Sequence, residues 1–303
     1  MKRHTVKKYN APRGWCVTAL LVLGAGCGES LLDAEPVAPS SLKAHEDRLA
    51  AGLEVQGVAA GAYHSLAVRT DGVVWTWGQN TDGQLGRGVA SVAPQATPLP
   101  ITLPRRMTAV AAGSGHSLAL DETGHVWAWG RNNRGQAGGQ DPSVRVLAPT
   151  QIPLLSGITA IAARADYSLA VDANGSVWAW GQNTDGELGQ PLAGPDANAH
   201  PTPVQVVIPA LAPGDPYLPQ APVDLTDPAE VTKIVSVAAG GHHVLALGRT
   251  GRVWGWGRND FAQVGTGASS TPVLTPTLIR TWVTAAIAAG ESHSILYLSL
   301  IQI

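Results

Sequence analysis

One position of a repeated pattern carries side chains that could do chemistry. Histidine stands there four times and tyrosine once, and an imidazole ring can bind a metal or carry a proton near neutral pH. Because equivalent positions of successive repeats lie apart in space, these rings need not converge on one ion. We therefore expect them to be structural, with each ring bonded to neighbouring backbone. The five residues are His64, His116, Tyr167, His243 and His293.

Three further features resemble binding sites but fit other roles better. His242 precedes His243 in the fourth copy only, and we expect it to be exposed. Two Asn-Thr-Asp-Gly loops, residues 80–83 and 183–186, faintly resemble calcium loops. In that register the first ligand position is a glycine and the twelfth is apolar, where a bidentate glutamate is needed. We interpret both loops as turns, because Asn and Asp before Gly are ordinary turn formers.

Carboxylates near the small-residue segments are the remaining candidates for catalysis. Glu54, Asp166 and Glu291 lie there unevenly and in no motif. Acid pairs such as Asp121 and Glu122 fall in expected turns, whereas a general acid needs burial to tune its pKa. The sequence has no nucleophile elbow, phosphate loop or His-Glu-x-x-His motif. We predict neither an enzyme nor a cofactor, and a glycan-acting propeller enzyme stays an alternative.

The element that must position these residues is a repeat built around paired tryptophans. The pattern Trp-x-Trp-Gly occurs four times, and its second tryptophans are 52, 51 and 76 residues apart. Short segments and glycine turns with a period of about 50 residues are typical of four-stranded β-propeller blades. We therefore predict an all-β propeller. The eight tryptophans are Trp75, Trp77, Trp127, Trp129, Trp178, Trp180, Trp254 and Trp256.

Three sequence blocks recur in order within each copy. They read A-A-G-x-x-H-S-L-A, then D-G-x-V-W-x-W-G-x-N, then G-Q-L-G. These blocks resemble the repeat of the regulator of chromosome condensation family, over about residues 55–297. The resemblance implies a propeller of seven blades. It also implies guanine-nucleotide exchange on a small nuclear GTPase, the role of the founding members, as an alternative function.

The chain supplies four full copies of the repeat and the opening of a fifth. An open arc of this kind would leave an apolar edge that could self-associate. A truncated, non-functional gene fragment is the competing interpretation. The expected blades cover about residues 55–106, 107–157, 158–233 and 234–283, with a partial blade over 284–303.

The N-terminus has the character of an export signal. Basic residues precede an apolar stretch from Trp15 to Ala25, which is too short to span a bilayer. The segment ending at Cys27 resembles a bacterial lipobox, so we predict a signal peptide over residues 1–27, lipidation of Cys27, and a tether over 28–54. Conventional signal cleavage is the alternative. The predicted location is the bacterial cell envelope, as an outer-membrane lipoprotein or a secreted protein.

The charge balance argues against nucleic acid as a partner. The chain carries a net charge of −2, and residues 1–26 hold five basic side chains and no acidic one. Removing those five positive charges leaves −7. A protein that binds phosphate backbones normally presents a basic face. We predict a non-catalytic scaffold that binds an unidentified protein through its loops and touches the membrane only by its lipid.

The third copy carries the features that would mark a binding surface. Extra residues between Gln190 and Lys233 are rich in proline and hold a dense acidic group. A stiff, extended insertion loses less entropy on docking a partner, whereas a tolerated insertion without function is equally consistent. Arg164 and Tyr167 also depart from the other copies, and we expect them to cluster beside the insertion. The predicted partner-binding residues are Arg164, Tyr167, Asp215, Tyr217 and Asp224.

Overall fold

A computed structural model describes six stretches of the chain. They are residues 54–139, 141–142, 145–190, 195–210, 232–279 and 283–298. The predicted signal peptide, Cys27 and almost the whole predicted tether lie outside them, as do Asp215, Tyr217 and Asp224. Among the described residues, no helix is long and apolar enough to cross a membrane.

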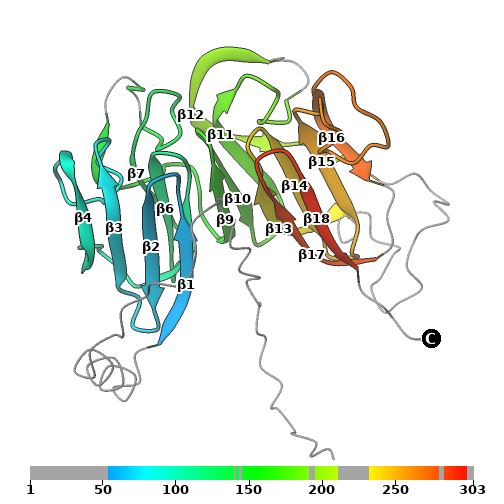
Figure 1. The fold of residues 1–303 in the computed structure, drawn as a ribbon. Coiled ribbons are helices and arrows are strands. Elements are labelled where there is room, and N and C mark those ends of the chain that lie inside the picture. Colours follow the sequence, from blue (N-terminus) through cyan, green and yellow to red (C-terminus); the bar gives the residue numbers. More distant parts are fainter. Residues whose placement is uncertain are drawn as a thin grey trace, which may run out of the picture. The chain divides into compact units, whose positions relative to one another are not determined.

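The described chain forms eighteen antiparallel strands in five sheets, so the all-β prediction is confirmed (Figure 1). Sheet 1 contains β1 (Val55–Ala60), β2 (His64–Arg69), β3 (Val74–Asn80) and β4 (Ser91–Pro100), and sheet 2 contains β5 (Met107–Ala112), β6 (His116–Asp121), β7 (Val126–Gly130) and β8 (Val146–Gln151). Sheet 3 contains β9 (Ile158–Arg164), β10 (Tyr167–Asp172), β11 (Val177–Asn183) and β12 (Asp196–Val206). Sheet 4 contains β13 (Ile234–Ala239), β14 (His243–Gly248), β15 (Val253–Gly257) and β16 (Val273–Ile279), and sheet 5 contains β17 (Thr284–Ala289) and β18 (Ser294–Leu298).

Each four-stranded sheet is a meander in which consecutive strands pair. The second and third strands are joined by a tight turn at an Asp-Gly, Thr-Gly or Asn-Gly pair. In sheet 1 the turn glycine, Gly72, has a φ of 81°, a conformation that favours glycine. The Asp71 carboxylate accepts a hydrogen bond from the Val73 amide at 3.0 Å and closes the turn.

Small residues let successive sheets approach through their first strands. β1 contacts β5, β5 contacts β9, β9 contacts β13, and β13 contacts β17. These strands are built from short side chains, for example Met-Thr-Ala-Val-Ala-Ala in β5. Behind them, Trp129, Trp180, Trp254 and Trp256 are fully buried. Burying such an aromatic stabilises the fold by a few kcal/mol, at about 25 cal/mol per Å² of apolar surface removed from water.

The loops after the third strands are held by one asparagine each. The Asn80 side chain accepts from the Leu85 amide at 3.1 Å and donates to the Val89 carbonyl at 2.8 Å. The Asn183 side chain accepts from the Leu188 amide at 3.2 Å in sheet 3. In both predicted Asn-Thr-Asp-Gly turns, the asparagine therefore organises the loop through backbone hydrogen bonds.

In sheets 2 and 3, the last residue of the second strand accepts a hydrogen bond from the first tryptophan of the pair. Asp121 accepts from Trp127 Nε1 at 3.0 Å, and Asp172 accepts from Trp178 Nε1 at 3.3 Å. Sheet 1 has Arg69 at this position, and its guanidinium lies 5.6 Å from the centre of the Trp75 ring. A cation cannot accept a hydrogen bond, so the Trp75 indole N–H is buried without a partner among the described residues.

The extra residues of the third copy fall in the later part of the predicted span 190–233. Residues 196–206 form β12, the fourth strand that every full sheet has. The connection from β12 to β13 then runs over residues 207–233, where the equivalent connections of sheets 1 and 2 need only residues 101–106 and 152–157.

Candidate functional site

Each sheet presents two chemically different ends. The turn between the first and second strands lies beside the end of the third strand, as the hydrogen bond from the Gln79 amide to the Tyr63 carbonyl shows. We call this the loop end. The opposite end, which we call the turn end, carries the glycine turns between the second and third strands and the connections to the next sheet.

The repeated histidines lie at the loop end and bond the next sheet. His64 Nε2 lies 2.9 Å from Ser117 Oγ, and that hydroxyl donates to the Gln84 carbonyl at 2.9 Å. The same carbonyl accepts from Trp129 Nε1 at 2.8 Å. Because the serine hydrogen goes to the carbonyl, Nε2 of the histidine is the donor. One carbonyl of sheet 1 thus anchors two side chains of sheet 2.

The same chain of hydrogen bonds recurs at two further interfaces. His116 Nε2 lies 2.9 Å from Ser168 Oγ, which donates to the Gln136 carbonyl at 2.9 Å. His243 Nε2 lies 3.0 Å from Ser294 Oγ in sheet 5. The sequence predicts backbone partners for these rings, whereas in the structure each Nε2 bonds a serine hydroxyl of the next sheet. The equivalent ring of sheet 5, His293, is exposed.

Burial keeps these rings neutral. It lowers the pKa of His64 to about 4 and that of His116 to about 3, and the nearby charges of His64 and Arg131 act on His116 in the same direction. The pKa of His243 falls to about 4 for the same first reason, burial. The three rings point into separate interfaces, so they form cross-sheet bonds and do not assemble a common metal site.

A glycine accommodates each histidine ring. A Cβ added at Gly113 would lie 2.1 Å from His116 Cε1, and one added at Gly61 would lie 2.2 Å from His64 Cε1. Both distances are far inside van der Waals contact, so the ring and any larger residue cannot coexist in this arrangement. The Gly-x-x-His spacing of the repeat therefore has a steric cause.

The third copy changes all members of this arrangement together. Tyr167 replaces the histidine, Arg164 replaces the glycine, and Val244 of sheet 4 replaces the serine. The Tyr167 hydroxyl donates across the interface toward the carbonyls of Gly240 at 2.9 Å and His243 at 2.8 Å. Tyr167 is fully buried, so the prediction that it contacts a partner protein is wrong.

The described ends of the insertion do not lie beside Arg164. Arg164 pairs with Tyr167 at the loop end of sheet 3, whereas Val206, which precedes the insertion, pairs with Val177 at the turn end. Beyond the insertion, the Ile234 amide bonds the Gly175 carbonyl of the sheet 3 turn. Arg164 and the described ends of the insertion therefore lie at opposite ends of one sheet, which contradicts the prediction that Arg164 clusters beside them. The Arg164 guanidinium lies 3.3 Å from the Glu291 carboxylate of sheet 5.

Ion pairs join the sheets along the loop end. Arg131 of sheet 2 contacts the Asp82 carboxylate of sheet 1 at 2.7 Å, and Arg145 contacts it at 3.0 Å. Asp166 accepts from the Gln136 amide at 2.9 Å. Asp166 and Glu291, two of the three carboxylates that a glycan-acting enzyme would use, are thus each engaged with a side chain of another sheet.

One cluster at the loop end differs from its counterparts. Asp185 and Glu187 of sheet 3 face His242 of sheet 4, whose Nδ1 lies 3.2 Å from an Asp185 oxygen and 3.0 Å from Glu187 Oε1. His242 is therefore partly buried and paired, so the expectation that it is simply exposed is wrong. The Glu187 hydrogen bond and both carboxylate charges raise the pKa of His242 against the effect of burial.

Glu187 stands where the other full copies have glutamine. The side-chain oxygen of Gln84 accepts from the Asp82 amide at 2.8 Å, and that of Gln136 accepts from the Arg134 amide at 2.8 Å. Glu187 keeps this bond, because its Oε2 accepts from the Asp185 amide at 2.8 Å. Its second oxygen, Oε1, occupies the place of the glutamine amide nitrogen and meets His242.

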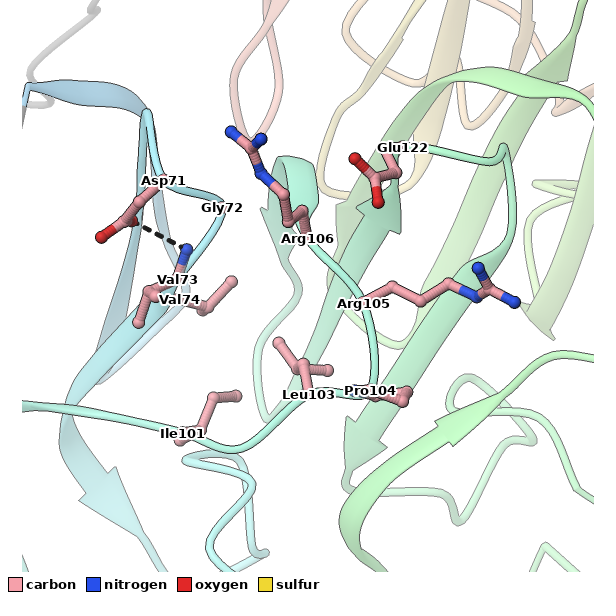
Figure 2. A pocket seen from close by; sticks show the side chains of 10 residues that line it. All are labelled: Asp71, Gly72, Val73, Val74, Ile101, Leu103, Pro104, Arg105, Arg106 and Glu122. Carbon is pink, nitrogen blue, oxygen red and sulfur yellow. Dashed lines mark hydrogen bonds between the residues drawn. The ribbon is translucent and has the colours of Figure 1, made fainter.

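The turn end holds a shallow pocket with a volume of about 440 Å³ (Figure 2). It lies between the sheet 1 turn at Asp71 and Gly72 and the connection that contains Arg105 and Arg106. Arg106 donates to the Thr70 carbonyl at 2.8 Å, so that guanidinium closes the connection onto the turn. The residues that line this pocket do not form a recognisable set of catalytic side chains.

Comparison with known proteins places the chain among related sequences. The sequence model described as RCC1-like domain matches residues 19–300. The chain is 32% identical over 256 residues to protein pim1 of Schizosaccharomyces pombe, covering 80% of this chain and 45% of pim1. It is 31% identical over 244 residues to protein RCC2 of Homo sapiens, covering 76% of this chain and 44% of RCC2. The chain therefore spans less than half the length of these relatives.

Solved structures show the same fold. Human WBSCR16 superimposes with a TM-score of 0.66 at 22% identity, over 80% of this chain and 58% of that one. Yeast RCC1 (Prp20), solved bound to Kap60, gives a TM-score of 0.64 at 24% identity, over 82% of this chain and 55% of that one.

Proposed function

The chain belongs to the RCC1-like domain family, and from that premise we propose that it is a non-catalytic module that binds another protein through its loop end. Related propellers are known with protein partners: yeast RCC1 (Prp20) was solved bound to Kap60, and another structure of Prp20p is described with its binding to Gsp1p and histones.

The observation that carries the proposal is a pair of exposed aromatic side chains at the loop end. Tyr63, in the β1–β2 turn, is 74% exposed, and Phe261, in the loop after β15, is 71% exposed. Val89 and Val92 add exposed apolar surface to the same end. Aromatic residues are enriched at protein interfaces and serve there as anchors, whereas a solvent-facing phenylalanine contributes nothing to the core.

Hydrogen bonds within its own loop give Phe261 a rigid support. The loop that carries Phe261 is fixed by the Gln263 side chain, which accepts from the Phe261 amide at 2.9 Å, and by Asn259, which accepts from the Val264 amide at 3.1 Å. A preorganised surface loses less conformational entropy when it binds.

Site-specific photocrosslinking in the cell of origin tests this proposal. A photoreactive phenylalanine at position 261 is compared with one at Leu154, which is 74% exposed at the turn end. We expect position 261, and not position 154, to crosslink one defined protein. Equal labelling of the same proteins from both positions would contradict a loop-end interface.

Location is part of the same proposal. The basic residues before the apolar stretch from Trp15 to Ala25, and the lipobox-like segment ending at Cys27, support export to the bacterial cell envelope and lipidation. Metabolic labelling with an alkyne fatty acid tests it, with Cys27→Ala as the control that should lose the label.

A nucleotide-release assay with a small GTPase tests the exchange-factor alternative, which the family resemblance alone supports.

Self-association is a second proposal, favoured by the outer strand of sheet 5. Tyr297 is 65% exposed there, and Ile295 and Leu298 are 40% and 39% exposed. Exposed apolar strands are sites of edge pairing. Light scattering on the chain should give the mass of a dimer, and Tyr297→Lys should return the monomer. A monomeric wild-type chain would contradict this.

A further inference from the structure

We infer that Asp185, Glu187 and His242 form a binding site for a divalent transition-metal ion such as Zn²⁺, built across the interface of sheets 3 and 4. Each residue offers one ligand atom, and these atoms lie within 4.8 Å of one another. Glu187 is fully buried, and Asp185 and His242 are partly buried. An imidazole nitrogen with two carboxylate oxygens is a donor set that suits Zn²⁺, whereas Ca²⁺ and Mg²⁺ take oxygen ligands.

The spacing of the ligand atoms fits a metal ion. His242 Nδ1 lies 3.0 Å from Glu187 Oε1 and 3.2 Å from Asp185 Oδ2. Zinc bonds of about 2.0–2.1 Å in a tetrahedron separate neighbouring ligand atoms by roughly 3.3 Å. Both distances are close to this edge length, so only small side-chain movements would bring the atoms to an ion.

The polarity of the cluster calls for a positive charge. A lone pair on His242 Nδ1 would face two carboxylates, whereas a hydrogen there is donated to Glu187 Oε1 at 3.0 Å, the same oxygen that accepts from the Gln182 amide at 3.0 Å. Either a proton or a metal ion must therefore lie between Nδ1 and the two acids. A metal ion would let Nδ1 and both carboxylates direct lone pairs to one centre, and it would let the Gln182 amide turn its oxygen toward that centre.

Comparison among the copies of the repeat gives a second, independent argument. Glutamine at the Glu187 position makes the same loop hydrogen bond in the three other full copies, so a carboxylate is not needed for the fold. Burying a carboxylate costs free energy unless a charge compensates it. Only the third copy has this carboxylate, and only the fourth copy has histidine at the position that faces it. The other copies have Tyr63, Gly115, Asp166 and Ser292 at that position.

The cluster is also oriented by its surroundings. The Asp185 amide holds the second Glu187 oxygen at 2.8 Å, and Arg258 Nε lies 3.5 Å from the second Asp185 oxygen. Outer partners of this kind fix the direction of metal ligands. Three protein ligands leave a fourth position for water or for a side chain of a bound protein.

Isothermal titration of the metal-free chain with ZnCl₂ tests the inference. We expect one saturable site, with affinity weakened tenfold or more in Glu187→Gln, a substitution that restores the residue of the other copies and should fold. His242→Ser, which copies the occupant of sheet 5, should weaken binding equally. Asp196→Asn is the matched control and should bind as the wild type, because it removes a carboxylate that lies 3.0 Å from His200 elsewhere in sheet 3.

Bound Co²⁺ gives a second readout that does not depend on affinity. Its visible absorption should show a low-coordinate site in the wild type and lose it in Glu187→Gln. Absence of saturable Zn²⁺ binding at micromolar concentration would overturn the inference. A proton, and not a metal ion, would then lie between His242 and the two carboxylates. Equal binding by the wild type and Glu187→Gln would overturn it as well.

Discussion

Tyr167 and Val244 face each other across the interface of sheets 3 and 4, in the positions that histidine and serine occupy at the other interfaces. Valine offers no hydroxyl to the preceding sheet, and the tyrosine hydroxyl reaches past it to the Gly240 and His243 carbonyls at 2.9 and 2.8 Å. Arg164 is tolerated because the histidine ring that would collide with its Cβ is gone. The changes at Arg164, Tyr167 and Val244 therefore form an alternative set of contacts between two sheets. Two of them, Arg164 and Tyr167, suggested a binding surface in the sequence.

Removing the Tyr167 hydroxyl should destabilise the protein. Tyr167→Phe keeps the ring and leaves the Gly240 carbonyl without its buried donor, so we expect a loss of about 1–2 kcal/mol in the free energy of unfolding. Urea denaturation followed by tryptophan fluorescence measures this. The exposed tyrosine Tyr63 provides the control, since Tyr63→Phe should change the free energy of unfolding very little.

The coupling among the three positions can be tested by restoring the common pattern. Tyr167→His with Val244→Ser should remain unstable while Arg164 is present, because its Cβ would overlap the new ring. Adding Arg164→Gly should recover stability, so the third substitution should be stabilising only in this background. Additive effects of the three changes would contradict the steric explanation.

The glycine before each histidine should be among the least replaceable residues of the fold. Gly113→Ala would place a Cβ 2.1 Å from His116 Cε1 and 2.8 Å from the Ala165 carbonyl oxygen. We expect a loss of at least about 2 kcal/mol in the free energy of unfolding. Gly57→Ala is the control, because its Cβ would approach only the Val68 side chain, at 3.3 Å. Thermal denaturation of both variants should show a much larger change for Gly113→Ala.

The sequence predicted the sheets well because their signals are local. The Trp-x-Trp-Gly pattern, a glycine turn before it and a small-residue strand upstream define three strands within about 25 residues. The serine partners of the histidines were missed, although serine follows the histidine position at Ser65, Ser117, Ser168 and Ser294. His64, His116 and His243 each bond the serine of the next copy, some 50 residues away, and comparing positions within one copy does not reveal that pairing.

The position of the insertion could have been predicted by counting strands. In an antiparallel meander the turn after the first strand and the connection after the fourth strand lie at opposite ends of the sheet. Arg164 ends a first strand and the insertion follows a fourth strand, so closeness in sequence was misleading. The Glu187 and His242 pair was harder to predict, because its two residues belong to different copies and each looks like a single exception.

Asp121 should stabilise sheet 2 as a charged acceptor. Burial alone would raise its pKa, but hydrogen bonds from Trp127, His125 and Thr123 lower the pKa to about 2. Asp121→Asn would replace one acceptor oxygen by an amide that faces another donor, so we expect a loss of about 1–2 kcal/mol. Glu122→Gln removes the same charge from the adjacent exposed position and should be nearly neutral. Similar losses in both variants would contradict a specific role for the Asp121 hydrogen bonds.

Stability should fall as the solution is acidified below about pH 6.5, because buried histidines resist protonation. Burial lowers the pKa of His64 to about 4 and of His116 to about 3, whereas unfolding returns each to an ordinary value near 6.5. Above pH 6.5 the rings are neutral in both states and contribute no pH dependence. Between about pH 6.5 and 4 the unfolded chain binds more protons than the folded chain, so the free energy of unfolding falls, by up to about 1.4 kcal/mol per pH unit for each ring. Urea denaturation at a series of pH values should show this slope, and His116→Gln should reduce it even though the variant is less stable at neutral pH. An unchanged slope in His116→Gln would contradict the assignment of a buried, neutral ring at this position.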